Sequence, residues 1–423
     1  MTIARRTLLG SAVALPLLSA CGAGARGTGA VRFEGWDYES QLVQQNLDRF
    51  TATNADIKVE YTPITSAQYV RKVVAEFTGN NGPDALYCYD DSLASWVQAG
   101  YLQPLDGLPG VDEIYQGIYA SNAQAMTFQG KRYGLPYYTD CQALIYNAAM
   151  LDKAGITTPP TTLDELEQQA LKLKNAGVLQ HPIGFAAQLS DAWAGWIWGL
   201  VYGSGGAMFT DNFTPSMATA QKVFDWVHKA ATTSKIIDPA GLQLTPVPLD
   251  NAMMAGQYAF TIGSRYALRT YNDPAKSKQA GKMKLAAIPS IDGTTKGTVS
   301  STRMYCLSAK TSVKDHAVRL LNYLGGPETA RFWFMQRGLG FAFKEMAVDA
   351  EIKATLAKFA EPDVYTGLAE NAKARNVLGA PWYSEFEAAL QKSVQQLLTN
   401  QADGAAVAAS LAETATSLAK KYS

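Results

Sequence analysis

The stretch VRFEGWDYESQLVQQNLDRFTATNADIKVEY, residues 31–61, decides the fold class. Its apolar residues alternate at 31–33, recur at helical spacing from 42 to 50, and alternate again at 57–61. Strand, helix and strand in this order predict two parallel strands joined by a helix that packs on the sheet. A third strand is expected over 85–89, after the turn at 81–84. The chain is therefore expected to be an α/β protein.

Further segments continue this alternation along the chain. GKRYGLPYYTDCQALIYN, residues 130–147, predicts an extended run because a glycine and a proline interrupt any helix. Thr162 and Glu165 form a capping box that opens a helix, and Gly177 closes it. Strands are expected over 257–262 and 303–308, and two helices are expected at the end, around 386–397 and from 404 to 420.

Size and composition bound the class of protein. A chain of 423 residues exceeds one core of ordinary size and is expected to form two domains. With 47% hydrophobic and 17% charged residues, the composition is that of a globular protein. The formal charge is zero, and loss of Arg5 and Arg6 with a signal segment leaves 35 basic against 37 acidic residues. This balance argues against nucleic acid as a partner.

Residues 1–20 are expected to be a signal peptide, because Arg5 and Arg6 precede an apolar stretch, 8–20, that is too short to span a bilayer. Leu18-Ser19-Ala20-Cys21 resembles the bacterial lipobox, which implies a mature chain that starts at Cys21 and is tethered by lipid to the outer face of the cytoplasmic membrane. A flexible linker would cover 21–29. An ordinary signal with a coincidental cysteine is the alternative. The arginine pair leaves both Sec and twin-arginine export open.

The three remaining cysteines, Cys88, Cys141 and Cys306, are expected to be buried free thiols, because each lies among aromatic or aliphatic residues. An oxidising location permits one disulfide, but the sequence does not choose the pair. The CxxC and His/Cys spacings of a metal site are missing, as is a phosphate-binding GxxxxGK[ST] motif. We expect neither a metal nor a cofactor.

Four segments carry a resemblance to a known family. They are NGPD to YLQPL at 81–105, GKRYGLP with LIYN and AGITTPPTT at 130–162, AMM to Gly263 at 252–263, and LGGPE at 324–328. In this order, and over nearly the whole mature chain, they resemble the carbohydrate-binding family of extracellular solute-binding proteins of bacterial ABC importers, which includes maltodextrin-binding protein.

The resemblance implies a fold and a function. The fold is the two-lobed α/β periplasmic-binding-protein (Venus flytrap) fold, in which hinged lobes close on a ligand and crossover strands join them. One lobe would comprise 30–138 plus 289–337, and the other 139–288 plus 338–423. The implied function is that of a monomeric, lipid-anchored receptor that hands a carbohydrate-like solute to the permease subunits of an ABC transporter.

Sugar recognition needs polar groups for hydroxyls and aromatic planes for the C–H faces of the rings. In open α/β sheets these groups are sought in loops just after strands, because ligands bind beyond the carboxyl ends of the strands. By resemblance, Asp37, Asp91 and Asp140 match ligand-contacting acidic positions. The candidates from the ends of the first and third strands and from the crossover are Trp36, Asp37, Tyr38, Tyr89, Asp90, Asp91, Thr139 and Asp140.

Aromatic and basic candidates follow later in the chain. By resemblance, residues 193–198 and Trp382 lie where relatives present sugar-stacking rings. Trp193 and Trp196 also have the i, i+3 spacing of a core-facing stripe, so at least one tryptophan of this segment is expected in the core. Relatives often have tryptophan where this chain has Arg265 or Tyr266. The candidates are Trp193, Trp196, Trp198, Ser264, Arg265, Tyr266, Arg303, Trp382 and Tyr383, with solvation at the surface the alternative for Arg303.

Two other function classes stay open beside a sugar binder. A surface glycoside hydrolase would use two carboxylates across a cleft, whose separation the sequence does not give. Against an enzyme, His181, His228 and His316 are scattered and no HExxH or GxSxG motif surrounds them. Arg265 and Arg303 favour the third class, a binder of a glycerophosphodiester or an amino-sugar derivative, because arginine favours carboxylate, phosphate or dense hydroxyls.

Overall fold

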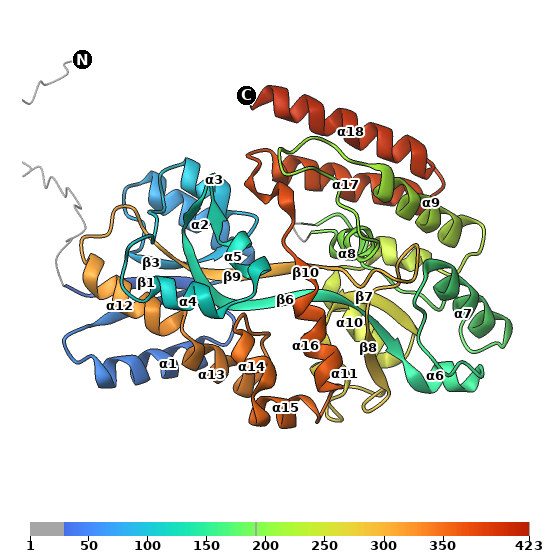
Figure 1. Cartoon of the computed structure of the whole chain (residues 1–423), viewed down its shortest axis with the longest axis horizontal. Helices are drawn as coiled ribbons and strands as arrows, with labels where there is room; N and C mark the ends of the chain where they lie inside the picture. The colour runs from blue at the N-terminus through green and yellow to red at the C-terminus, as the bar shows by residue number, and fades with distance from the viewer. Residues whose placement is uncertain (1–28, 191–192, 423) are drawn as a thin grey trace, which may run out of the picture.

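The computed structural model describes residues 29–190 and 193–422, which form two α/β lobes that share long strands (Figure 1). The predicted signal peptide, Cys21 and nearly all of the predicted linker lie outside the described residues. Within the described part of the chain, no helix combines the length and hydrophobicity needed to cross a bilayer. The α/β class predicted from residues 31–61 is confirmed.

The first lobe is built on the strand–helix–strand unit that opens the described chain. Strands β1 (Val31–Trp36) and β2 (Val59–Ile64) are parallel, and α1 (Ser40–Thr53) connects them. β3 (Ala85–Tyr89) is also parallel to β1, and α2 (Ser66–Thr78) packs against β1. Because the three strands are parallel, their carboxyl ends lie at one edge of the sheet. The buried face of α1 holds the residues whose spacing predicted it: Leu42, Val43, Leu47 and Phe50.

Strand β6 (Gly134–Asn147) passes from one lobe to the other. Its first part pairs antiparallel with β9 (Thr298–Leu307), which also pairs with β3. From Gln142 onward, β6 pairs instead with β7 (Phe260–Ser264) and β8 (Met283–Ala286). Figure 1 shows β6 and β9 running through the centre of the molecule. The extended run predicted over 130–147 contains this strand.

The second lobe carries a layer of helices on its outer side (Figure 1). α7 (Leu163–Asn175) begins with the predicted capping box, in which Thr162 accepts a hydrogen bond from the Glu165 amide at 2.9 Å and the Glu165 carboxylate accepts from the Thr162 amide. The two helices predicted at the end of the chain are α17 (Tyr383–Leu398) and α18 (Gly404–Lys421). The Asp403 side chain caps the start of α18 by accepting a hydrogen bond from the Ala406 amide. α9 (Ala218–Thr232) packs against both helices.

The remaining elements are short. In the first half of the chain they are α3 (Leu93–Gln98), α4 (Val111–Gly117), α5 (Ala120–Ala125), β4 (Thr127–Phe128), β5 (Lys131–Arg132), α6 (Ala148–Lys153) and α8 (Gly195–Gly203). In the second half they are η1 (Pro239–Gln243), α10 (Pro246–Ala255), α11 (Ala267–Tyr271), α12 (Lys314–Leu324), α13 (Pro327–Arg337), α14 (Lys344–Val348), α15 (Ala350–Leu356), α16 (Pro362–Glu370), β10 (Ala372–Lys373) and η2 (Asn376–Gly379).

The cysteines that the structure describes are buried and free, as predicted: Cys88, Cys141 and Cys306. Burial raises the pKa of the Cys88 thiol well above its ordinary value, and it raises the pKa of the Cys141 thiol to about 12. Both thiols therefore stay protonated at neutral pH, and they contribute to packing as small apolar side chains.

Candidate ligand-binding site

A buried ion-pair network lies where the end of β3 meets the crossover strand β9. Asp90 is 1% exposed, and its Oδ2 accepts a hydrogen bond from the Thr302 amide at 2.9 Å. Its Oδ1 accepts from Arg303 Nη1 and from Arg375 Nη2, both at 3.1 Å. Three donors thus engage this carboxylate, and it ties β3, β9 and the segment after β10 together. Asp90 was predicted to contact a ligand, and the structure gives it this internal role instead.

The neighbouring carboxylate, Asp91, has a different environment. Its side chain is half-buried and accepts a hydrogen bond from Ser92 Oγ at 3.3 Å. Burial, together with repulsion from Asp90, raises the pKa of Asp91 above its ordinary value. No further hydrogen bond to this carboxylate is seen among residues 29–190 and 193–422, so Asp91 keeps accepting capacity that Asp90 has used.

Aromatic rings surround Arg375 on the second-lobe side of the network. The Arg375 Cζ lies 4.2 Å from the ring centroid of Trp193 and 5.2 Å from that of Tyr383. Arg375 also donates a hydrogen bond to the Tyr383 hydroxyl, which in turn donates to Glu387 Oε2 at 3.0 Å. Trp193 is half-buried, whereas Tyr383 is 4% exposed. Of these two predicted rings, Trp193 is the one with surface to offer a ligand.

On the first-lobe side, the ends of β1 and β3 place two predicted aromatic residues together. Trp36 and Tyr89 stack with ring centroids 4.5 Å apart and planes inclined by 19°. Trp36 is 4% exposed and also packs against Tyr69 and Tyr87, so it is a core ring beneath Tyr89. Arg303 lies over Tyr89, with Cζ 4.6 Å from the ring centroid. Tyr89, half-buried, is therefore the ring nearer the surface.

A second buried ion pair joins β6 to the end of β7. Asp140 Oδ1 lies 3.3 Å from Arg265 Nε and accepts from the Cys141 amide at 2.9 Å, while Ser264 Oγ donates to Oδ2. Burial raises the pKa of Asp140 to about 6, a rise that Arg265 opposes. Arg265 is 1% exposed and lies over the ring of Tyr365, at 4.3 Å. Asp140 and Arg265 were predicted to face a ligand, and the structure pairs them with each other.

Thr139 points into a neighbouring polar cluster. Asn122 donates from Nδ2 to Thr139 Oγ1 at 2.6 Å and to Thr302 Oγ1 at 2.9 Å, which links α5 to both crossover strands. A cavity of about 10 Å³ lies beside this cluster and is lined in part by Thr139, Asp140, Arg265 and Ser300. It has room for about one water molecule and is too small for a sugar.

Two tyrosines connect the lobes at the ends of β1 and β7. The Tyr38 and Tyr266 hydroxyls are 2.9 Å apart and share a hydrogen bond, and both side chains are half-buried. Burial, then the bond to Tyr266, raises the pKa of Tyr38 above its ordinary range, so the Tyr38 hydroxyl remains neutral at physiological pH. Asp37, one residue earlier, is exposed and accepts from the Ser66 amide and hydroxyl at 3.1 Å each. Asp37 therefore caps the start of α2.

Three predicted tryptophans lie in the core of the second lobe. Trp198 is fully buried and donates from Nε1 to Glu387 at 2.9 Å. Trp382 is 3% exposed and packs against Phe209, with ring centroids 5.5 Å apart. Trp196 stacks on Phe185 at 4.1 Å. The prediction that at least one tryptophan of 193–198 lies in the core is confirmed, and Trp382, which the resemblance gave as a sugar-stacking ring, is found buried.

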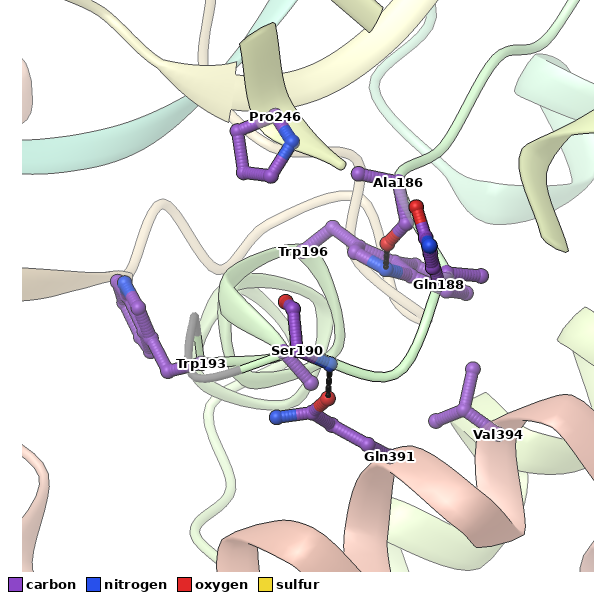
Figure 2. A pocket seen from close by; sticks show the side chains of 10 residues that line it. Ala186, Gln188, Ser190, Trp193, Trp196, Pro246, Gln391 and Val394 are labelled. Atoms are coloured by element: carbon purple, nitrogen blue, oxygen red, sulfur yellow. Dashed lines mark hydrogen bonds between the residues drawn. The ribbon is translucent and has the colours of Figure 1, made fainter. Parts of the chain in front are cut away.

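A separate cavity of about 30 Å³ lies behind Trp196, between the segment 186–190, α10 and α17 (Figure 2). Figure 2 shows Trp196 turned toward Ala186, whose carbonyl accepts from Trp196 Nε1 at 3.0 Å, and Trp193, which also lines the cavity, on the other side of α8. Ser190 donates from its amide to Gln391 Oε1 at 3.1 Å. This cavity has room for about one or two water molecules and is too small for a sugar ring.

The sequence interpretation missed two residues that organise this region, Arg375 and Glu387. Arg375 stands in the segment Ala374-Arg375-Asn376 and Glu387 within the apolar stripe of α17, and neither shows a local motif. Their partners are remote in sequence, since Asp90 lies 285 residues from Arg375 and Trp198 lies 189 residues from Glu387. Within the described ranges, no cluster of three or more His, Cys, Asp or Glu side chains could hold a metal ion.

The arrangement suits recognition of a neutral, hydroxyl-rich molecule. Tyr38, Tyr266, Tyr89 and Trp193 offer hydroxyls and ring surface, and Asp91 offers an acceptor. Arg265 is already paired with Asp140, and Arg303 and Arg375 share Asp90. A polyol can exchange hydrogen bonds with such groups and place its C–H faces on the rings without adding charge.

Comparison with known proteins places this geometry in context. The family model of the bacterial extracellular solute-binding protein matches residues 45–360. A putative binding protein of Brucella abortus is 23% identical over 281 residues, which cover 65% of this chain and 66% of the relative, slightly under two thirds of its length. An erythritol/L-threitol-binding protein of Mycolicibacterium smegmatis is 25% identical over 221 residues, covering 44% of this chain and 46% of that protein.

Solved structures share the whole fold. The maltose-bound MalE3 of T. maritima superposes with a TM-score of 0.77 at 19% identity, covering 92% of this chain and 99% of that chain. At this identity the likeness supports the fold alone. It confirms the predicted two-lobed arrangement.

Proposed function

Because this chain belongs to the bacterial extracellular solute-binding protein family, we propose that it captures a sugar or polyol between its lobes and delivers it to the permease of an ABC importer. Membership of this family places the protein outside the cytoplasm. The ligand, the permease partner and the lipid anchor are parts of the proposal. The relative named for binding erythritol and L-threitol supports a polyhydroxylated ligand.

One observation carries the proposal. Half-buried Tyr38 and Tyr266 meet across the lobes, and half-buried Tyr89, Trp193 and Asp91 flank the network that Asp90 forms with Arg303 and Arg375. A ligand held there contacts both lobes only when they are close together. Binding therefore stabilises the closed form, which is the form a permease can distinguish from the open one.

The lipid anchor is inferred from the N-terminal sequence, and the oligomeric state is inferred from the composition of the site. We infer that Cys21 carries the lipid and that residues 21–29 link it to the first lobe, which begins at residue 30. The proposed lobe boundaries remain 30–138 plus 289–337 and 139–288 plus 338–423. We propose a monomer, because each chain contains both halves of the site.

The two other function classes receive less support from the geometry. A glycoside hydrolase needs a carboxylic acid and a carboxylate free to act on a bond, whereas Asp90 and Asp140 are held by arginines. A phosphodiester binder needs unpaired arginines, and Arg265 and Arg303 are paired. We therefore propose binding without chemistry.

Thermal unfolding with added solutes tests the proposal. A specific ligand at 100 times its dissociation constant stabilises the folded state by about 2.7 kcal/mol. We expect maltose or erythritol to raise the unfolding midpoint, and glycerophosphocholine to leave it unchanged. A rise only with glycerophosphocholine would identify the phosphodiester class, and no response to any polyol would contradict a sugar site.

Variants then locate the site and test for chemistry. Trp193→Ala and Asp91→Ala should each weaken binding of the solute that raised the midpoint, whereas Asp48→Ala, on the exposed face of α1, should not. Equal effects of Asp91→Ala and Asp48→Ala would move the site elsewhere. Maltose incubated with the protein should be recovered intact, and its cleavage would establish an enzyme.

A further inference from the structure

Arg375 makes one polar contact to the first lobe and several contacts within the second. Its Nη2 lies 3.1 Å from Asp90 Oδ1, and its side chain is 1% exposed. Its Cζ lies 4.2 Å from the Trp193 ring centroid, and its Nη1 donates to the Tyr383 hydroxyl. The planar guanidinium is therefore held at its edge by a carboxylate and a hydroxyl while its face meets the indole.

We propose that Arg375 is a positioning residue that holds the Trp193 ring in the orientation used for ligand binding, and that Asp90 fixes Arg375 from the first lobe. This inference rests on the proposed function, since it assigns Trp193 a ligand-binding role. The inference adds Arg375, which no sequence pattern indicated, to the residues that shape the proposed ligand-binding site. Arg375 acts through Trp193, and its position depends on a carboxylate of the opposite lobe.

The backbone around Trp193 explains why its ring needs support. Trp193 precedes the first residue of α8, Gly195, whose amide donates to the Trp193 carbonyl at 2.8 Å. The residue thus stands in a turn before the helix. Among residues 29–190 and 193–422, its half-buried indole shows no ring stacking like that of Trp196 and no side-chain hydrogen bond like that of Trp198. A ring fixed before binding loses less rotamer entropy when a sugar stacks on it.

Arg375 is itself fixed by its surroundings. Tyr383, which accepts from Arg375, donates to Glu387 at 3.0 Å, and Glu387 also accepts from the Ala194 amide at 2.6 Å. The chain of contacts returns to the residue next to Trp193. A lysine would supply charge to Asp90 but could not present a planar face to the indole while bridging two acceptors.

Fluorine NMR of the ligand-free protein labelled with 5-fluorotryptophan tests the positioning directly. Trp193→Phe assigns the Trp193 signal by its loss. We expect Arg375→Met and Arg375→Lys to shift or broaden that signal. The matched control is Arg303→Met. Arg303 also lies 3.1 Å from Asp90, but its guanidinium stacks on Tyr89 and not on Trp193. It should leave the Trp193 signal in place. An unmoved Trp193 signal in either folded Arg375 variant overturns the inference.

A double-mutant cycle with maltose tests the consequence for binding. A cation–π contact supports a loss of about tenfold in affinity for Arg375→Met in the native background. In the Trp193→Ala background the same change should cost nothing further. An equal loss in both backgrounds would mean that Arg375 touches the ligand itself, for example through Nε, which has no partner among the described residues. A gain in affinity would mean that the guanidinium occupies the place of the sugar.

These outcomes separate the inference from the proposed function. If the native protein binds none of the tested polyols, the proposed function fails, while the fluorine spectra still decide whether Arg375 fixes the ring. If the native protein binds maltose and the cycle shows no coupling between Arg375 and Trp193, the proposed function stands and the inference fails.

Discussion

Replacement of Asp90 by alanine should destabilise the protein more than any other change at the strand ends. The substitution removes an acceptor that engages three donors and leaves two guanidinium groups, on Arg303 and Arg375, without their shared carboxylate. Arg375 is 1% exposed, so water cannot replace the lost partner. Removing one member of a buried ion pair costs about 3–5 kcal/mol.

The size of the effect can be converted into an unfolding temperature. An unfolding entropy of about 2.1 cal/mol/K per residue gives roughly 0.8 kcal/mol/K for a mature chain of about 400 residues. A loss of 3–5 kcal/mol then lowers Tm by about 4–6 °C. Circular dichroism of the mature chain during heating, without ligand, measures this shift. Asp90→Asn keeps one oxygen acceptor and should give a smaller loss.

The adjacent carboxylate supplies the control for this experiment. Asp91 is half-buried and bonded to a serine hydroxyl, so Asp91→Ala should change stability by less than about 1 kcal/mol. The same loss in both variants would refute the reasoning, because it would show that the arginine network adds nothing to the stability of the strand end. A larger loss for Asp91→Ala would refute it more strongly.

Three further predictions address other parts of the structure. Glu34 is buried beside Glu76, Lys72 and Arg32, and burial raises its pKa to about 8. Because the folded-state pKa of Glu34 is above its unfolded value, the folded state binds more protons than the unfolded state between about pH 4.5 and 8. The free energy of unfolding should therefore fall as the pH rises through this window, by up to about 1.4 kcal/mol per pH unit. Urea titrations across that range should show the slope, and Glu34→Gln should flatten it. Glu387→Ala leaves three donors, the Ala194 amide, Trp198 Nε1 and the Tyr383 hydroxyl proton, without their acceptor and should cost about 3 kcal/mol, whereas Glu387→Gln should cost less. An unchanged urea midpoint for the alanine variant would contradict this. Tyr266→Phe removes the hydrogen bond to Tyr38 that joins the lobes, worth about 1 kcal/mol, and should increase the radius of gyration of the ligand-free protein in small-angle scattering; Tyr422→Phe, far along the chain at the end of α18, should not.

Local sequence was enough for the elements and for the fold class. The helix that begins with the Thr162 capping box and the strands at 31–36 and 85–89 follow from spacing and cap chemistry, which act over a few residues. The strand predicted over 257–262 is found at 260–264, because Gly256 ends α10 in a left-handed conformation and the chain then needs several residues to enter the sheet.

Local sequence could place the candidate residues at strand ends, but it could not separate their roles. Asp90 and Asp91 are adjacent and chemically identical, yet Asp90 is enclosed by two arginines and Asp91 is half-buried. Likewise, the six residues 193–198 hold three tryptophans, of which two are core rings and one flanks Arg375.

The reason is that neighbouring side chains point to different faces, and each face is completed by segments far away in the sequence. Arg303 and Arg375 reach Asp90 across 213 and 285 residues, and Arg265 reaches Asp140 across 125. The sequence alone therefore determined which segments are strands and helices and which chemistry stands at their ends. Only the tertiary structure decided which carboxylates are neutralised by buried arginines and which keep acceptors for a ligand, because charge pairing depends on distance in space.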